Sequence, residues 1–368
     1  MLSRRSSARI EPPLRVAATA LALAALLPLA ATAADDDPSA LAASVMSRDR
    51  LPSLSIAIAG DGRTVYSNAF GLADVEHSVP ASPKTVYRIG SITKPITATA
   101  ILQLSEQGRL DLDLPIETYC PDFPSKPETI TARDLLAHLG GIRDYDYARF
   151  DEEFLSRTRY ASIGGALGVF AADPLIAEPG TRHQYSSFGY VLLGCAVEGA
   201  SGEPFGSYLR QKVFRVGGMS QTALDVPEEI VPHRASTYSK ARDGSWMNSP
   251  FVDLSDRFPA GGLLSTPADL VAFGIALLDG KLLGAETWEA MVTRRETRGG
   301  ETFAYAAGWR LSDRPGEIFH GGTSVGGSAY LYIRTGSRTV VAFATNVDRW
   351  TEPRHELAQA LADWAESR

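Results

Sequence analysis

Two kinds of hydrophobic pattern alternate along the chain, and their order predicts a sheet assembled from both of its ends. Near each end, apolar and β-branched residues form short runs separated by glycine-containing turns, which is typical of antiparallel strands. Gly60-Asp61-Gly62 is the strongest turn signal, because such residues tolerate the backbone angles of a tight hairpin. The expected strands are residues 54–59, 63–71, 305–311, 317–320, 328–334 and 339–345.

The middle of the chain is predicted to be mostly helical, with long loops. Thr131 and Thr266 are expected to cap the helices that follow them, because a threonine side chain accepts a hydrogen bond from a free N–H of the first turn. The expected helices are residues 41–49, 91–108, 130–139, 185–199, 205–214, 267–278 and 352–367.

This order of elements predicts an α/β (α+β) fold. An antiparallel sheet built from the N- and C-terminal strands, about residues 48–90 and 300–368, is flanked by the terminal helices. A mostly helical insertion, about residues 91–299, completes the domain. Active sites favour the boundary between such layers, and the first helix of the insertion begins there.

Residues 1–33 differ in pattern from the rest of the chain. Four arginines precede an alanine- and leucine-rich run over residues 16–29, and Ala-Thr-Ala follows at 31–33. This is the pattern of a secretory signal peptide, so we expect Sec export, cleavage after Ala33, and a periplasmic or secreted protein of residues 34–368. The run is short for a membrane span, which needs about 20 residues.

Charge and composition narrow the classes of partner. Removal of four arginines and one glutamate with the signal peptide takes the formal net charge from −7 to −10. An acidic chain with no basic run gives no indication of a nucleic-acid partner. Six scattered histidines without an H-E-x-x-H or C-x-x-C motif indicate no metal site. The oligomeric state is not predicted.

The two cysteines allow two interpretations. Cys120 and Cys195 can pair in an oxidising compartment. However, Cys195 lies inside an apolar helical pattern over residues 191–197, where a buried free thiol is the usual state. We therefore expect unpaired cysteines, with the disulfide as the alternative.

The segment over residues 88–95 holds the strongest chemical signal. Ser91 and Lys94 are three residues apart at a predicted helix start, so they lie about one turn apart on one face. A buried lysine amine can accept the serine proton, and the free N–H groups of the helix start favour a developing anion. As ordinary structure, the pair would be a helix cap followed by a solvated lysine. Two further elements downstream favour a nucleophile.

The second element is Tyr185-Ser186-Ser187, which follows a Pro-Gly turn. A tyrosine held at such a junction can relay a proton between the nucleophile and the leaving group, and Ser187 can contact the substrate. The third element is His320-Gly321-Gly322-Thr323 at the end of a predicted strand. Glycines there let a substrate approach the backbone, and the N–H of Thr323 can form an oxyanion hole with that of Ser91. A core tyrosine and a plain glycine turn are the structural alternatives.

Taken together, S-x-x-K, Y-x-S and H-G-G in this order resemble the serine β-lactamase-like and penicillin-binding hydrolases. The segments 108–113, 135–142 and 260–266 are similar to the same family, and 119–124, 185–190 and 248–253 look most like its mitochondrial β-lactamase-like protease branch. The resemblance covers nearly all of residues 34–368. It implies a β-lactamase/transpeptidase-like fold and acyl transfer without a cofactor. In that scheme Ser91 is the nucleophile, Lys94 and Tyr185 transfer protons, and His320 belongs to the third motif.

Two departures bear on the substrate. Class C β-lactamases have asparagine where this chain has Ser187, and lysine where it has His320, so an amide contact and a fixed cation are absent at these positions. Both changes favour a small peptide, amide or ester substrate. A true β-lactamase or D,D-peptidase and a non-catalytic binder of cell-wall fragments or a protein partner remain alternatives.

A second serine motif offers another enzyme class. Gly322-Thr323-Ser324-Val325-Gly326 matches the G-x-S-x-G elbow of α/β-hydrolases, but that elbow requires a helix after it and a strand is expected here.

Three further residues are assigned structural roles. His138, within the expected helix 130–139, is interpreted as a core histidine. Tyr238 is interpreted as a packing residue, and Asn346 as a residue that forms a hydrogen bond at a strand end.

Overall fold

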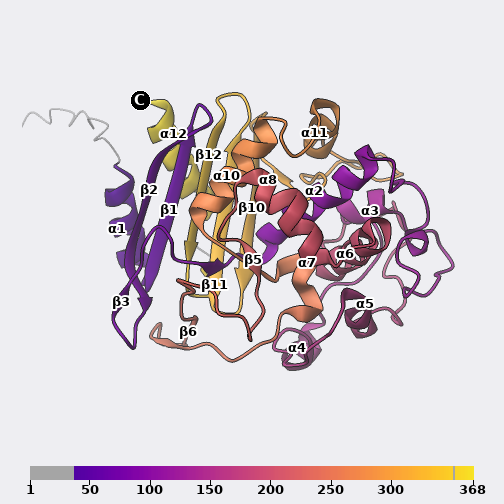
Figure 1. The fold of residues 1–368 in the computed structure, drawn as a ribbon, viewed down its shortest axis with the longest axis horizontal. Coiled ribbons are helices and arrows are strands. Elements are labelled where there is room, and N and C mark those ends of the chain that lie inside the picture. Colours follow the sequence, from indigo (N-terminus) through magenta and orange to yellow (C-terminus); the bar gives the residue numbers. More distant parts are fainter. Residues whose placement is uncertain (1–36, 351–352) are drawn as a thin grey trace, which may run out of the picture. The chain divides into compact units, whose positions relative to one another are not determined.

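The computed structural model of the protein describes residues 37–350 and 353–368; the expected signal peptide, residues 1–33, lies outside the described residues. Its central feature is a seven-stranded antiparallel sheet with the order β3-β2-β1-β12-β11-β10-β9 (Figure 1). Strand β1 pairs with β12, so the two ends of the chain meet inside one sheet, as predicted. The strands are β1 (Ser53–Gly60), β2 (Arg63–Asp74), β3 (Val79–Pro80), β9 (Arg310–Leu311), β10 (Glu317–Ser324), β11 (Gly327–Arg334) and β12 (Thr339–Thr345).

Two smaller sheets accompany the large one. They consist of β4 (Tyr87–Arg88), β8 (Leu263–Ser265) and β5 (Ala223–Leu224), and of the hairpin β6 (Tyr238–Lys240) with β7 (Trp246–Asn248). The turn between β1 and β2 has positive φ at Asp61 and Gly62, +49° and +71°, which matches the twist of the flanking strands.

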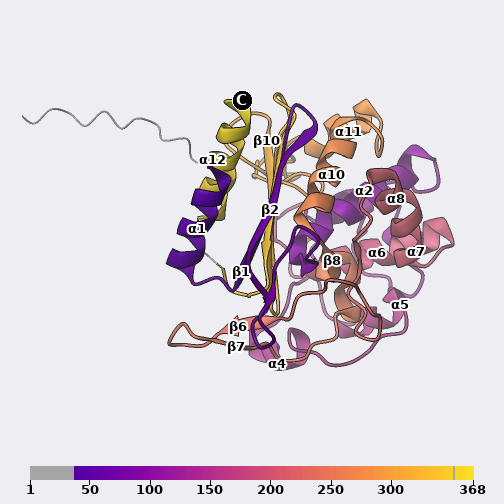
Figure 2. The same ribbon diagram turned by 60° about the vertical axis from the view of Figure 1, so that its left-hand side comes forward.

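Helices cover both faces of the large sheet, as Figure 2 shows with the sheet nearly edge-on. The terminal helices α1 (Pro38–Asp49) and α12 (Arg354–Glu366) lie on one face, and the insertion helices on the other. Strand β1 suits both cores because its side chains alternate, with large ones under the terminal helices and small ones under the insertion. The large set is Leu54, Ile56 and Ile58, and the small set is Ala57 and Ala59.

The insertion helices vary in length. They are α2 (Thr93–Glu106), α3 (Ala132–Leu136), α4 (Phe150–Glu153), α5 (Ile163–Ala166), α6 (Ser187–Ser201), α7 (Phe205–Tyr208), α8 (Arg215–Gly217), α9 (Phe258–Gly261), α10 (Pro267–Leu278) and α11 (Ala285–Val292). Short 3₁₀ or π turns occur at η1 (Gly90–Ile92), η2 (Ile116–Thr118), η3 (Tyr147–Arg149), η4 (Leu167–Val169), η5 (Leu209–Phe214) and η6 (Ser255–Arg257). None of the helices within residues 37–350 and 353–368 has the length and apolar character needed to cross a bilayer.

Helix α2 is buried around its whole circumference. Every residue from Thr93 to Leu104 is buried, and the helix contacts α6 and α9. A helix that is apolar on all sides belongs inside a protein, so a polar side chain at its first turn is also taken out of water. The fold therefore buries Lys94.

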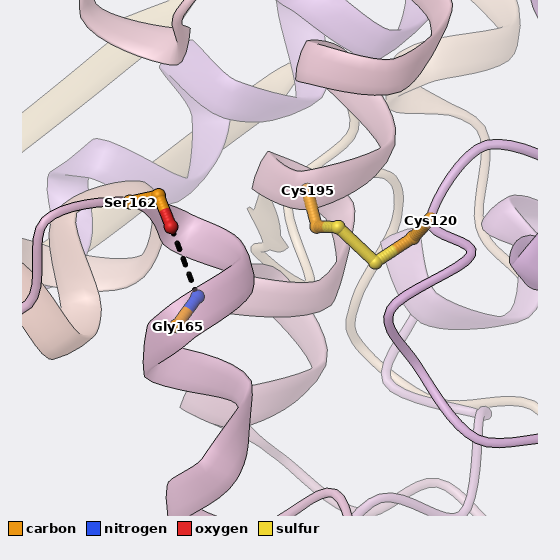
Figure 3. The surroundings of a disulfide bond; sticks show 4 residues. All are labelled: Cys120, Ser162, Gly165 and Cys195. Carbon is orange, nitrogen blue, oxygen red and sulfur yellow. Dashed lines mark hydrogen bonds between the residues drawn. A yellow bond between two sulfur atoms is a disulfide. The ribbon is translucent and has the colours of Figure 1, made fainter.

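Cys120 and Cys195 form a disulfide bond between the segment after η2 and helix α6 (Figure 3). The expectation of unpaired cysteines is therefore wrong. The apolar pattern places Cys195 correctly in a buried helix, but its partner lies 75 residues earlier and only the tertiary fold brings the two together. The two segments are in tight contact, because a Cβ added at Gly199 would lie 1.7 Å from the carbonyl oxygen of Tyr119. Nearby, Ser162 caps α5 by accepting a hydrogen bond from Gly165 N–H.

Among the local predictions that differ from the structure, two lie close to the candidate site. The helix expected at 130–139 is the shorter α3, capped by Thr131 as predicted, and His138 follows it with φ +59°. The strand expected at 305–311 is reduced to β9, because the N–H of Ala306 bonds back to Trp309 and Gly308 has φ +83°.

Candidate active site

Ser91 and Lys94 lie together at the start of α2. The Lys94 Nζ donates to Ser91 Oγ at 3.0 Å, to the Ala260 carbonyl of α9 at 2.9 Å and to Ser187 Oγ at 3.4 Å. A lysine ammonium has three N–H groups, so these three oxygens satisfy it completely although the side chain is fully buried. A neutral amine would keep two of these bonds and offer its lone pair to the Ser91 hydroxyl.

Tyr185 lies directly before α6 rather than within it, because Ser186 is the helix cap. Its ring centroid is 4.7 Å from Lys94 Nζ and 4.3 Å from the ring centroid of His138. Among the described residues, none forms a hydrogen bond with the phenol oxygen of Tyr185. That oxygen is therefore available to a ligand, while the ring is held by its neighbours.

Ser187 is fixed from two sides. Its N–H donates to Asp144 Oδ1 at 2.9 Å, and its hydroxyl accepts from Lys94 Nζ. The structure thus brings Ser187 to the lysine, whereas the sequence predicted only a substrate contact. Asp144 was not singled out from the sequence, since no motif marks it.

His320 is almost completely buried, 1% exposed, and both of its ring nitrogens have partners. Nδ1 lies 2.8 Å from the Gly321 carbonyl, which can only accept, so Nδ1 carries the proton. Nε2 is 3.2 Å from the hydroxyl of Tyr305, which therefore donates to it. Burial lowers the pKa of His320 well below its usual 6.5, and the charges of Arg310 and Lys94 lower it further. The imidazole at this position is neutral.

His138 is a second buried, neutral imidazole beside Tyr185. The Ser186 N–H donates to its Nδ1 at 3.1 Å, so the ring proton is on Nε2, the opposite tautomer to His320. Within the described residues Nε2 has no hydrogen-bond partner. Burial, then the charge of Lys94, lowers the pKa of His138 well below 6.5. Its interpretation as a core histidine agrees with its burial, 2% exposed, but the ring is not fully hydrogen-bonded and it contacts Tyr185.

The glycines of β10 bring its backbone against the turn that carries Ser91. A Cβ added at Gly322 would lie 1.8 Å from the Ile89 carbonyl and 3.0 Å from Ser91 N, and one at Gly90 (φ +51°) would lie 2.6 Å from Thr323 N. Only glycine permits this approach. The backbone at Ser91 and the backbone at Thr323 are thereby brought close together, so that their N–H groups can form the predicted oxyanion hole.

Gly321 belongs to the other face of the sheet. A Cβ added there would lie 3.4 Å from Arg354 Nη2 of α12 and 3.3 Å from the Tyr330 ring. Gly321 therefore contributes only backbone atoms to the site. Its carbonyl accepts the hydrogen bond that orients the His320 ring.

Arg310 on β9 is a site residue that the sequence analysis missed. Its guanidinium lies 5.6 Å from the centroid of the Tyr185 ring, and the residue is exposed. Within the described residues its guanidinium forms no hydrogen bond and no ion pair, although its backbone pairs with β10. The absence of a lysine at position 320 therefore does not leave the site without a permanently charged cation. No motif marks Arg310, and the expected strand at 305–311 gave it no particular position.

The second serine motif does not form a nucleophile elbow. Ser324 ends β10, is 6% exposed, and is followed by the two-residue turn to β11 rather than by a helix. Tyr238 and Asn346 have structural roles, because the Tyr238 hydroxyl accepts from Val75 N–H and the Asn346 amide bonds four separate partners. Within residues 37–350 and 353–368, no cluster of three or more His, Cys, Asp or Glu side chains could hold a metal ion.

Known proteins are similar to this chain in sequence. The chain is 32% identical over 298 residues to the human serine beta-lactamase-like protein LACTB, mitochondrial, covering 63% of this chain and 54% of that protein. It is 30% identical over 299 residues to the putative penicillin-binding protein PbpX of Bacillus subtilis, covering 79% of this chain and 69% of that protein. The chain thus spans about half the length of the mitochondrial relatives it matches.

Solved structures agree with this relationship. A D-stereospecific amidohydrolase from Streptomyces sp. superposes with a TM-score of 0.75 at 25% identity, covering 88% of this chain and 98% of that chain. The family model described as Beta-lactamase matches residues 38–366, which is nearly the whole of the described chain. The chain has a mixed α/β fold with a central antiparallel sheet and a serine–lysine pair at the start of a buried helix. Its sequence is also directly similar to the members of this family. On these grounds the chain belongs to the beta-lactamase family.

Proposed function

We propose that the protein is a serine hydrolase that forms an acyl-enzyme at Ser91 on a small peptide, amide or ester substrate. The observation that carries this proposal is the fully buried amine of Lys94, 3.0 Å from Ser91 Oγ. A serine hydroxyl is a weak nucleophile until a neighbouring base takes its proton. The family's serine hydrolase character and the amidohydrolase neighbour support the same reaction class.

The proposed reaction has two steps. In the first, Ser91 Oγ attacks the substrate carbonyl carbon while its proton passes to Lys94 or Tyr185, and the N–H groups of Ser91 and Thr323 stabilise the oxyanion. The bond from that carbon to the leaving nitrogen or oxygen then breaks, and the leaving group takes the proton. In the second step water attacks the ester carbonyl by the same route, which releases the acid and restores the Ser91 hydroxyl. Either Lys94 or Tyr185 can serve as the base.

We also propose that the mature protein, residues 34–368, acts in the periplasm or outside the cell after Sec export. The Cys120–Cys195 disulfide supports an oxidising compartment, because disulfides are rare where thiols are kept reduced. N-terminal sequencing of the protein recovered from the envelope or the medium tests this, with alanine at position 34 expected as the first residue.

A β-lactamase or D,D-peptidase activity is the second candidate. It is favoured by Arg310, whose exposed guanidinium near Tyr185 can bind the carboxylate of such substrates. Nitrocefin turnover set beside turnover of an aminoacyl ester ranks the two candidates, and faster nitrocefin hydrolysis would favour the second.

The test of the nucleophile is labelling by a fluorophosphonate with a short alkyl group. We expect the wild type to be labelled, Ser91→Ala to be unlabelled, and Ser324→Ala to be labelled like the wild type. Labelling that persists in Ser91→Ala would exclude Ser91 as the nucleophile. No labelling of the wild type would favour a non-catalytic binding protein.

A further inference from the structure

A largely apolar groove shares Thr323 with the candidate oxyanion hole, and Lys94 and Tyr185 are not among the residues that line it. It has a volume of about 670 Å³, within the usual range of small-molecule sites. Phe150, Phe154, Val325 and Met247 of the β6–β7 hairpin supply apolar surface to it. The charged residues Lys240, Arg242, Asp348 and Arg349 also line it. The groove is therefore continuous with the site at which the substrate carbonyl is expected.

The walls of this groove are apolar surface left in contact with water. Tyr147 stacks on Phe150 with ring centroids 6.3 Å apart, and Phe150 stacks on Phe154 at 5.0 Å, so one wall is a continuous row of rings. Tyr147 is 80% exposed and Met247 is 53% exposed. Large apolar side chains gathered around an open groove are a feature of binding sites, because their exposure gains nothing for the folded protein alone.

The direction of the groove identifies which part of a substrate can occupy it. Tyr185 and Lys94 pass a proton to the leaving group, so the leaving group lies on their side, near His320 and Arg310. Strands rise about 3.3 Å per residue, which places Thr323 about 10 Å along β10 from His320. With the carbonyl oxygen at the N–H groups of Ser91 and Thr323, the acyl group points away from Tyr185 and into the groove.

We propose that this groove is an acyl-binding subsite, and that the preferred substrates carry a large apolar acyl group, aliphatic or aromatic. The inference rests on the proposed acyl transfer at Ser91 and adds the class of acyl group that is transferred. Burial of each additional methylene between Tyr147, Phe150 and Met247 lowers the free energy of the acylation transition state relative to free substrate. Short acyl groups leave the groove filled with water.

A series of p-nitrophenyl esters with acetyl, butyryl and hexanoyl groups tests the proposal. For the wild type we expect kcat/KM to rise by at least about tenfold from acetyl to hexanoyl, after subtraction of the rate with Ser91→Ala. In Tyr147→Ala/Met247→Ala the ratio of hexanoyl to acetyl kcat/KM is expected to fall at least fivefold. The matched control is Phe251→Ala, which removes an aromatic side chain that is 58% exposed and does not line the groove.

The outcomes separate this inference from the proposed function. Fluorophosphonate labelling that depends on Ser91, together with a flat ester series, would overturn the acyl subsite and leave the hydrolase intact. An equal loss on all three esters in the groove variant, or the same change of ratio in Phe251→Ala, would also overturn it. Turnover that persists in Ser91→Ala would overturn both. Both substituted groove residues are exposed, so the variant is expected to fold, and its circular dichroism melting curve checks this.

Discussion

The two ends of the candidate site are built in opposite ways. At the proton-transfer end, Lys94, His138 and His320 are buried, and they are held by hydrogen bonds and by ring contacts with Tyr185 and Tyr305. At the groove end, Tyr147 and Met247 are largely exposed, and Tyr147 stacks on the ring of Phe150. Hydrogen bonds and ring contacts fix the side chains at the first end, whereas the second end presents mainly apolar surface.

This difference indicates where each property of the protein resides. Removing one member of a buried polar network disturbs the positions and protonation of the others, because its partners remain buried and unpaired. An open apolar wall loses only the contact area of the side chain that is changed. Reaction chemistry is therefore expected to depend on the buried end, and substrate preference on the groove.

The sharpest test of this contrast is Lys94→Met. It is expected to lower kcat/KM by at least about 10⁴-fold, because Ser91 loses its neighbouring base. It is expected to lower the free energy of unfolding by no more than about 2 kcal/mol, since the lost contact with the Ala260 carbonyl is offset by removal of a buried polar group from the core. Steady-state kinetics and urea titration measure the two quantities.

The control for Lys94→Met is Lys84→Met, which removes an exposed lysine outside the site. Its kcat/KM and stability are expected to equal those of the wild type. Retention of more than a tenth of the activity in Lys94→Met would contradict the role given to the buried amine.

The next largest effect is the loss of stability expected when the disulfide that anchors α6 is removed. This helix begins at Ser187 and directly follows Tyr185 and Ser186. The double variant Cys120→Ser/Cys195→Ser removes a cross-link that closes a loop of 75 residues, and we expect the free energy of unfolding to fall by about 4 kcal/mol. Where the variant remains folded, kcat/KM is expected to stay within twofold of the wild type. A large loss of activity without a loss of stability would show that the disulfide shapes the site itself.

The buried histidines predict a pH dependence of stability. Because burial lowers the pKa of His138 far below 6.5, the unfolded chain binds a proton below about pH 6.5 that the folded protein does not bind. Stability therefore falls as the pH falls through this range, by about 1.4 kcal/mol per pH unit for each such histidine. His138→Gln is expected to reduce the slope of unfolding free energy against pH by about 1.4 kcal/mol per pH unit, which corresponds to one proton. Equal slopes in urea titrations between pH 5 and 6.5 would contradict the assignment.

The smallest expected effect concerns Arg310, which we expect to distinguish substrates with a carboxylate on the leaving group from neutral esters. Arg310→Gln is expected to raise KM about tenfold for substrates whose leaving group carries a carboxylate, because a charge-assisted hydrogen bond is lost. Neutral esters are expected to respond by less than twofold. The ratio of the two effects is the measurement, and an equal response to both substrates would show that Arg310 does not bind the carboxylate.

Local signals predicted much of the fold correctly. Helix α10 occupies the expected residues with Thr266 as its cap, and β12 matches its predicted bounds, because both depend on periodicity and neighbouring residues. The pairing of Cys120 with Cys195 was predicted wrongly, since it depends on segments far apart in sequence. Ser91 and Lys94 were found because one helical turn brings them together. Arg310 and His138 reach Tyr185 only through tertiary packing, which no local pattern contains.

The pairing of β1 with β12 also constrains the order in which the chain matures. Ser55 pairs with Ala344, so nearly the whole polypeptide must leave the ribosome before the central strands can meet. At usual translation speeds of about 5–20 residues per second, the β1–β2 hairpin waits roughly 15–60 s for its partner. During that interval the face of the hairpin that β12 and the terminal helix later cover has no partner, so the central sheet cannot form until synthesis is almost finished.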